Sequence, residues 1–133
     1  MIVLDTHALI WWVNGDAQLS DRAREAVEAE QATEGGVILV SAISAWEIGM
    51  LVVRERLTLT MSVDDWLDVA GSIDGLRFVP VDNHIGVEST RLPGTFHKDP
   101  ADCMIVALAR SLNAPLLTAD DKVRGYKHVR TIW

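Results

Sequence analysis

The 133-residue sequence has a single cysteine, Cys103, no apolar run as long as a membrane-spanning helix, and no excess of basic residues. One cysteine excludes an internal disulfide, and its apolar neighbours favour a packed thiol over a nucleophile. A spanning helix needs roughly 18 apolar residues in a row. The first residues, MIVLD, lack the basic region and cleavage site of a signal peptide. We therefore expect a cytoplasmic protein with no membrane association.

The net charge of −7, from 12 basic and 19 acidic residues, argues against nucleic-acid binding through a broad basic surface. It does not exclude a nuclease, because acids that hold divalent cations lower the formal charge, and the cations then supply a positive field. The hydrophobic content of 49% indicates a globular fold. The length predicts one domain, residues 1–133, without room for a second catalytic domain.

Short apolar runs alternate with amphipathic segments along the whole chain. We expect strands at residues 2–4, 37–40, 77–81, 116–118 and 129–133, and helices at 7–13, 20–32, 44–54, 62–73, 82–92 and 100–112. This order predicts an α/β fold of three layers, α/β/α, with a mostly parallel central sheet.

Acidic residues stand where a parallel sheet binds its ligands, outside the carboxyl ends of the strands. Asp5 and Asp120 directly follow expected strands, and Glu47 and Asp102 lie in or near the first turns of helices. If those helices begin at the same edge of the sheet, the four carboxylates converge.

Some of these acids have a purely structural alternative. Asp99 precedes Pro100, so it is either a helix N-cap or a further ligand. Ser44 and Glu47 have the spacing of a capping box, so Glu47 is either a cap or a ligand. Asp102 alone would merely favour the positive end of the helix dipole.

The helix that carries Glu47 is expected to bury Ile43, Trp46, Met50 and Val53. Most of the five tryptophans should lie in the core or at a dimer interface. Gly49 is unfavourable inside a helix, which suggests close packing against a neighbour, and the same holds for Gly86.

Four clustered carboxylates cannot all stay ionised without cations, so convergence implies a metal site or raised pKa values. Oxygen ligands without a converging Cys or His pair favour Mg²⁺ or Mn²⁺ over Zn²⁺. The chemistry natural to such a site is phosphodiester hydrolysis by a metal-activated water.

Several motifs resemble the PIN-domain family, and more closely its VapC-type ribonuclease toxins. They run in order along nearly the full chain: Leu4-Asp-Thr-His7 with Trp11-Trp12, Ser44-Ala-Trp-Glu-Ile48, His97-Lys-Asp-Pro-Ala-Asp102 with Ile105-Val-Ala107, Leu117-Thr-Ala-Asp120 and Ile132-Trp133. The resemblance implies a metal-dependent endoribonuclease that pairs with a small VapB-like antitoxin and forms a homodimer.

Carried over by position, the resemblance makes Asp5, Glu47, Asp102 and Asp120 the catalytic metal ligands, with Asp99 as an extra acid. The chain departs from common family residues at Ala101 and Lys98, which affects substrate contacts rather than the metal site. Possible supporting or RNA-contacting residues are Thr6, His97, Lys98 and Thr118.

His97 could contact phosphate or be simply an exposed loop residue. Basic residues near the acids could guide an RNA backbone or be ordinary solvated surface: Lys98, Lys122, Arg124 and Lys127.

Three rival functions are weaker. A housekeeping PIN-type RNA-processing or DNA nuclease would share the site, but the short chain favours the toxin. An aspartyl phosphatase needs a second acid two residues after Asp5, where His7 stands. A receiver-like signalling domain needs paired acids there and a phospho-accepting Asp after the third strand.

Overall fold

A computed structural model describes all residues, 1–133, as alternating strands and helices. The strands are β1 (Ile2–Leu4), β2 (Ile38–Ser41), β3 (Leu76–Val79), β4 (Leu116–Leu117) and β5 (Thr131–Ile132). The helices are α1 (Thr6–Val13), α2 (Asp21–Ala32), α3 (Ile43–Val53), α4 (Val63–Gly71), α5 (Asn83–Glu88), α6 (Pro100–Ser111) and α7 (Asp121–Arg124). None of the helices has the length and apolarity needed to cross a membrane.

All strands belong to one parallel sheet in the order β3-β2-β1-β4-β5. The chain adds β2 and β3 on one side of β1 and then returns to add β4 and β5 on the other side. The order of the strands therefore reverses at β1 and β4, and the crevice outside their carboxyl ends is where such sheets bind ligands.

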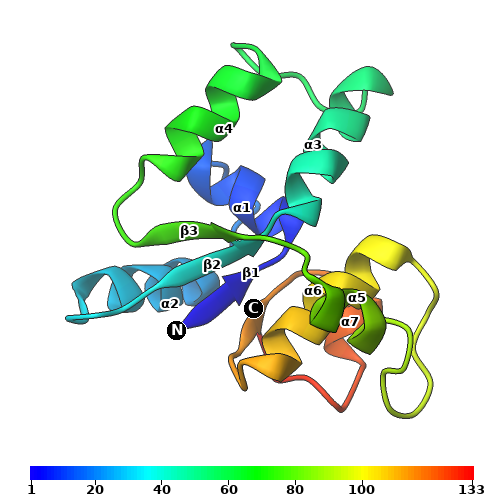
Figure 1. Cartoon of the computed structure of the whole chain (residues 1–133). Coiled ribbons are helices and arrows are strands. Elements are labelled where there is room, and N and C mark those ends of the chain that lie inside the picture. Colours follow the sequence, from blue (N-terminus) through cyan, green and yellow to red (C-terminus); the bar gives the residue numbers. More distant parts are fainter.

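Helices cover both faces of the sheet, which confirms the predicted three-layer α/β fold (Figure 1). Alternation along β1 sends Ile2 and Leu4 to one face and Val3 to the other. One core packs under α1, α2 and α4, and it includes the fully buried Ile48 of α3. The second core packs under α5, α6 and α7, with Val106 of α6 fully buried.

Side-chain caps fix the beginnings of several helices at the predicted residues. Ser20, Ser62, Asp82 and Asp99 each accept a hydrogen bond from the backbone N–H three residues later. One predicted boundary was wrong, and one helix was missed. The helix after Asp82 ends at Glu88 rather than near residue 92, and α7 was not predicted because four residues show no periodicity.

The predicted buried face of α3 was also wrong. The helix buries Ser44 and Ile48, whereas the side chains of Trp46 and Val53 are 59% and 76% exposed. Gly49 does not pack closely, since a Cβ built there would meet no atom within 4 Å, and the same holds for Gly86. The apolar residues of α3 therefore exceed what the core uses.

Candidate active site

Asp5 stands directly after β1, and both of its carboxylate oxygens are held. Oδ1 accepts a hydrogen bond of 2.8 Å from the N–H of Ala8, so Asp5 caps α1. Oδ2 accepts a hydrogen bond from the hydroxyl of Thr118, a fully buried residue just after β4. The neighbouring strands β1 and β4 thus fix the orientation of this acid.

Thr118 also positions a second acid. Its Oγ1 accepts a hydrogen bond of 3.1 Å from the N–H of Asp120. Asp120 caps α7 through Oδ1, which accepts from the N–H groups of Lys122 and Val123 at 2.8 and 3.2 Å. The sequence interpretation of Thr118 as a supporting residue agrees with these contacts.

Glu47 reaches the site from α3 and is held by Thr6 of α1, whose hydroxyl donates to Glu47 Oε1. Thr6 Oγ1 also lies 2.8 Å from Ser44 Oγ. Because Thr6 has one hydroxyl hydrogen, which goes to the carboxylate, Ser44 must donate to Thr6. Of the two alternatives for Glu47, the capping box is therefore absent: neither Ser44 nor Glu47 caps α3, and α3 has no side-chain cap at Ala42.

The start of α6 contributes two further acids. Asp99 Oδ1 accepts a hydrogen bond of 3.0 Å from the N–H of Asp102, so Asp99 is the N-cap of α6, with Pro100 in the first turn. The side chain of Asp102 is 24% exposed and points toward the same cavity as Asp5 and Glu47. Asp99 also lines this cavity, so capping does not remove it from the site.

A cavity of about 410 Å³ joins the five acids, which come from four parts of the chain. We call it the acid cavity; its lining residues are Asp5, Thr6, His7, Trp11, Glu47, Asp99, Asp102, Ala119 and Asp120. The predicted convergence of acids at one edge of the sheet is therefore present. His7 and Trp11, which were not predicted there, lie one turn apart on α1, and this spacing after Asp5 was the available signal.

Burial and mutual repulsion raise the pKa values of three acids. Desolvation raises the pKa of Asp5 and that of Glu47, against the lowering effect of their hydrogen bonds to Thr118 and Thr6. For Asp102, desolvation together with the charges of Asp99 and Asp120 raises the pKa to about 7. The cavity thus favours the uptake of positive charge, either protons or a cation.

In the present arrangement no three of these acids lie close enough to bind one ion together. Mg²⁺ usually keeps several of its waters and takes only one or two carboxylates directly. A set of oxygen donors spread around an open cavity therefore fits a hydrated divalent cation better than a closed cage with four protein ligands.

The remaining predicted residues lie around the cavity at different distances from it. His97 Nε2 lies 2.9 Å from Asp102 Oδ2, without a hydrogen bond between them. Lys98 is exposed and lines a separate groove beside α5 and α6. Lys122, Arg124 and Lys127 are exposed and do not line the acid cavity. Lys127 lies with Asn113 and Arg130 near the amino ends of β4 and β5, away from the site.

Comparison with known proteins agrees with this geometry. The family model of the PIN domain matches residues 2–129. Ribonuclease VapC22 of Mycobacterium tuberculosis is 33% identical over 134 residues, which cover 99% of this chain and 98% of the relative.

Solved structures share the fold at lower identity. VapBC2 from Rickettsia felis, bound to a promoter DNA fragment, superposes with a TM-score of 0.69 at 18% identity over 98% of this chain and 97% of that one. VapC20 of Mycobacterium tuberculosis, described as a toxin that cleaves the sarcin-ricin loop, superposes with a TM-score of 0.57 at 17% identity over 98% and 99%. The chain therefore belongs to the PIN-domain family, as a member of its VapC group.

Proposed function

We propose that the chain is an endoribonuclease toxin that depends on Mg²⁺ or Mn²⁺ and cleaves RNA phosphodiesters with water. The observation that carries the proposal is the convergence of Asp5, Glu47, Asp102 and Asp120 on one cavity. The relative that is 33% identical over nearly the full chain is a ribonuclease. A bound metal ion would supply an activated water and stabilise negative charge on the phosphate.

The protein's own contribution is positioning. Thr118 fixes Asp5 and the backbone of Asp120, and the chain of hydroxyls from Ser44 through Thr6 fixes Glu47. Hydrogen bonds to the ionised carboxylates favour their charged form, which is the form that binds a cation. His97 lies beside Asp102 through a buried Nε2 and is not among the residues that line the acid cavity.

Cleavage of RNA by the purified chain tests this function. We expect cleavage with Mg²⁺ or Mn²⁺, none with EDTA, and a loss of at least roughly 100-fold in Asp5→Asn. The Asn side chain can still cap α1, so the fold should persist. Asp102→Asn and Asp120→Asn should show the same loss, while full activity in Asp5→Asn would overturn the site assignment.

The ends of the product distinguish two mechanisms. Attack by water leaves a 5′-phosphate and a 3′-hydroxyl, whereas attack by the 2′-hydroxyl of the RNA leaves a cyclic phosphate. We expect a 5′-phosphate in end-labelling experiments. Cyclic phosphate ends would assign the reaction to His97 or another base instead of the metal site.

We further propose that the chain forms a homodimer and binds a small VapB-like antitoxin. The Rickettsia felis neighbour is a VapBC assembly. An antitoxin Arg or Lys would find the acidic cavity a favourable partner and would compete there with metal ions. Mn²⁺ should therefore weaken the affinity for the antitoxin, as should Asp102→Asn without metal. If neither Mn²⁺ nor Asp102→Asn changes the affinity for the antitoxin, the antitoxin inhibits the enzyme at another place. Analytical ultracentrifugation of the purified chain tests the homodimer.

A further inference from the structure

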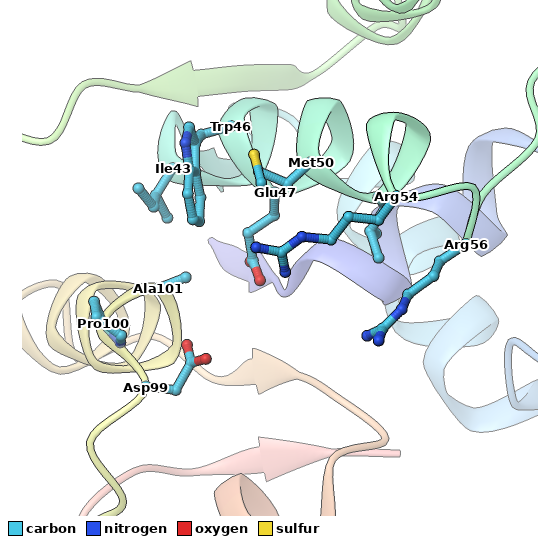
Figure 2. A pocket seen from close by; sticks show the side chains of 10 residues that line it. Ile43, Trp46, Glu47, Met50, Arg54, Arg56, Asp99, Pro100 and Ala101 are labelled. Atoms are coloured by element: carbon cyan, nitrogen blue, oxygen red, sulfur yellow. The ribbon is translucent and has the colours of Figure 1, made fainter.

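A second groove of about 410 Å³ lies directly beside the acid cavity, between α3 and the start of α6. We call it the α3 groove, and Figure 2 shows its side chains. The two cavities share Glu47 and Asp99, so they form one continuous path along α3. The lining residues are Ile43, Trp46, Glu47, Met50, Leu51, Arg54, Arg56, Asp99, Pro100 and Ala101.

Two arginines bring positive charge into this groove at the end of α3. The N–H of Glu55 bonds to the carbonyl of Val52, and the N–H of Arg56 bonds to that of Leu51, with Glu55 at φ 57°. This C-terminal turn reverses the chain, so that Arg54 and Arg56 line the same groove (Figure 2). Neither guanidinium lies within an ion-pair distance of an acid.

The groove also has an exposed aromatic wall. The side chain of Trp46 is 59% exposed, and it stands with Met50 on the side of α3 that faces the groove (Figure 2). Gly49, between them in sequence, leaves open space, since a Cβ there would meet nothing within 4 Å. A flat ligand therefore has access to the indole.

We propose that the α3 groove binds the nucleotide next to the phosphate that is cleaved, with Trp46 stacking on its base and Arg54 and Arg56 binding its phosphate. This inference rests on the proposed ribonuclease function. It makes the three residues positioning residues, which hold the RNA strand in register with the acid cavity.

Charge and shape favour RNA as the occupant. On a protein of net charge −7, two arginines without acidic partners beside a cluster of acids mark a local site for an anion. A single RNA strand offers alternating flat bases and phosphates, which match an indole followed by two guanidinium groups. An acidic peptide would match the arginines but offers no succession of flat faces, and it is the alternative that the experiment separates.

The first test uses the salt dependence of binding. Arg54→Gln/Arg56→Gln is compared with Arg22→Gln/Arg77→Gln, which removes two exposed arginines that form no side-chain hydrogen bond or ion pair and do not line the groove. Single-stranded RNA is titrated with Ca²⁺ in place of Mg²⁺, so that the acids are neutralised. Loss of the contact with this one phosphate should reduce the slope of log K against log salt by about 0.7. The control pair should keep the wild-type slope.

The second test removes each partner of the proposed stacking contact, first the indole of Trp46 and then the RNA base. Trp46→Ala should weaken RNA binding about 5- to 150-fold, and Trp46→Phe should restore part of the loss. An abasic nucleotide at the groove position should weaken binding to the wild type, but should not weaken binding to Trp46→Ala further. If Trp46 only supports the fold, Trp46→Ala should weaken the binding of intact RNA and of abasic RNA by the same factor. That result would overturn the stacking role.

The outcomes separate this proposal from the ribonuclease function. If the wild type neither binds nor cleaves RNA, the proposed function itself fails. If the wild type cleaves RNA and the arginine pair leaves affinity and salt slope unchanged, only the α3 groove proposal fails. If Arg54→Gln/Arg56→Gln instead abolishes the binding of an acidic antitoxin peptide and leaves RNA binding intact, the groove binds the protein partner. That result would overturn the proposal.

Discussion

The helices α3 and α6 begin at the same edge of the sheet, and both contribute to the acid cavity: α3 carries Glu47, and the start of α6 carries Asp99 and Asp102. They differ in what they bury. Helix α6 buries nearly all its apolar side chains, with Ile105 only 2% exposed. Helix α3 buries Ser44 and Ile48 but leaves Trp46 exposed.

This difference distinguishes apolar residues that stabilise the fold from apolar residues that are free to contact a ligand. The core stabilises α6 by burying its apolar face. Trp46 of α3 is exposed and lines the groove beside the acid cavity, so we expect it to contribute little to stability. Trp46 lines the α3 groove together with Ile43 and Met50, and a contiguous exposed apolar patch beside a cavity indicates a contact surface. The following substitutions test this contrast.

The largest expected effect is on stability. Ile105→Ala should lower the free energy of unfolding by roughly 2–5 kcal/mol, because it leaves a cavity in the core. Trp46→Ala should change it by less than about 0.5 kcal/mol, because the side chain is largely exposed. Urea denaturation of both variants measures the difference. Equal losses would show that Trp46 is part of the folded core and would remove the contrast between the helices.

The second effect concerns pH in the metal-free protein. The folded state raises the pKa of Asp102 to about 7, so between about pH 4 and 7 it holds a proton that the unfolded chain has lost. Stability should therefore fall as pH rises through this window, by up to about 1.4 kcal/mol per pH unit for this one group, and level off above it. Asp102→Asn should lose this part of the slope. Denaturation of both proteins in EDTA at several pH values measures it. The same pH profile in Asp102→Asn and the wild type would contradict a pKa of Asp102 raised by burial and by the neighbouring acids.

The smallest effect concerns how the two helices end. Both close with the same turn, with Glu55 at φ 57° after α3 and Asn113 at φ 49° after α6. Asn tolerates this left-handed conformation better than Glu, so Glu55→Gly should stabilise the protein by about 1 kcal/mol. The matched change Glu28→Gly inside α2 should destabilise it by about 1 kcal/mol. Thermal denaturation measures whether each substitution raises or lowers the melting temperature. A lower melting temperature in Glu55→Gly would exclude strain at this turn.

The sequence predicted those parts of the fold that depend on local signals. The beginning of α6 follows from Asp99 and Pro100, and the convergence of the acids follows from alternating strands and helices in a parallel sheet. The face of α3 was not predictable, because apolar spacing does not say whether a neighbour covers it. The hydrogen bond between Ser44 and Thr6 was not predictable either, because the two residues are 38 positions apart. The spacing of Ser44 and Glu47 fits a local helix cap equally well.

Calorimetric titration of Mn²⁺ into the wild type and Asp5→Asn tests most directly whether the acids of α3, α6 and the strand ends act as one cation site. Binding of metal to the folded state should also raise the melting temperature of the wild type. We expect saturable binding by the wild type and its loss in Asp5→Asn, with the variant still folded. No binding by the wild type, or equal binding by both proteins, would contradict a metal site at the acid cavity.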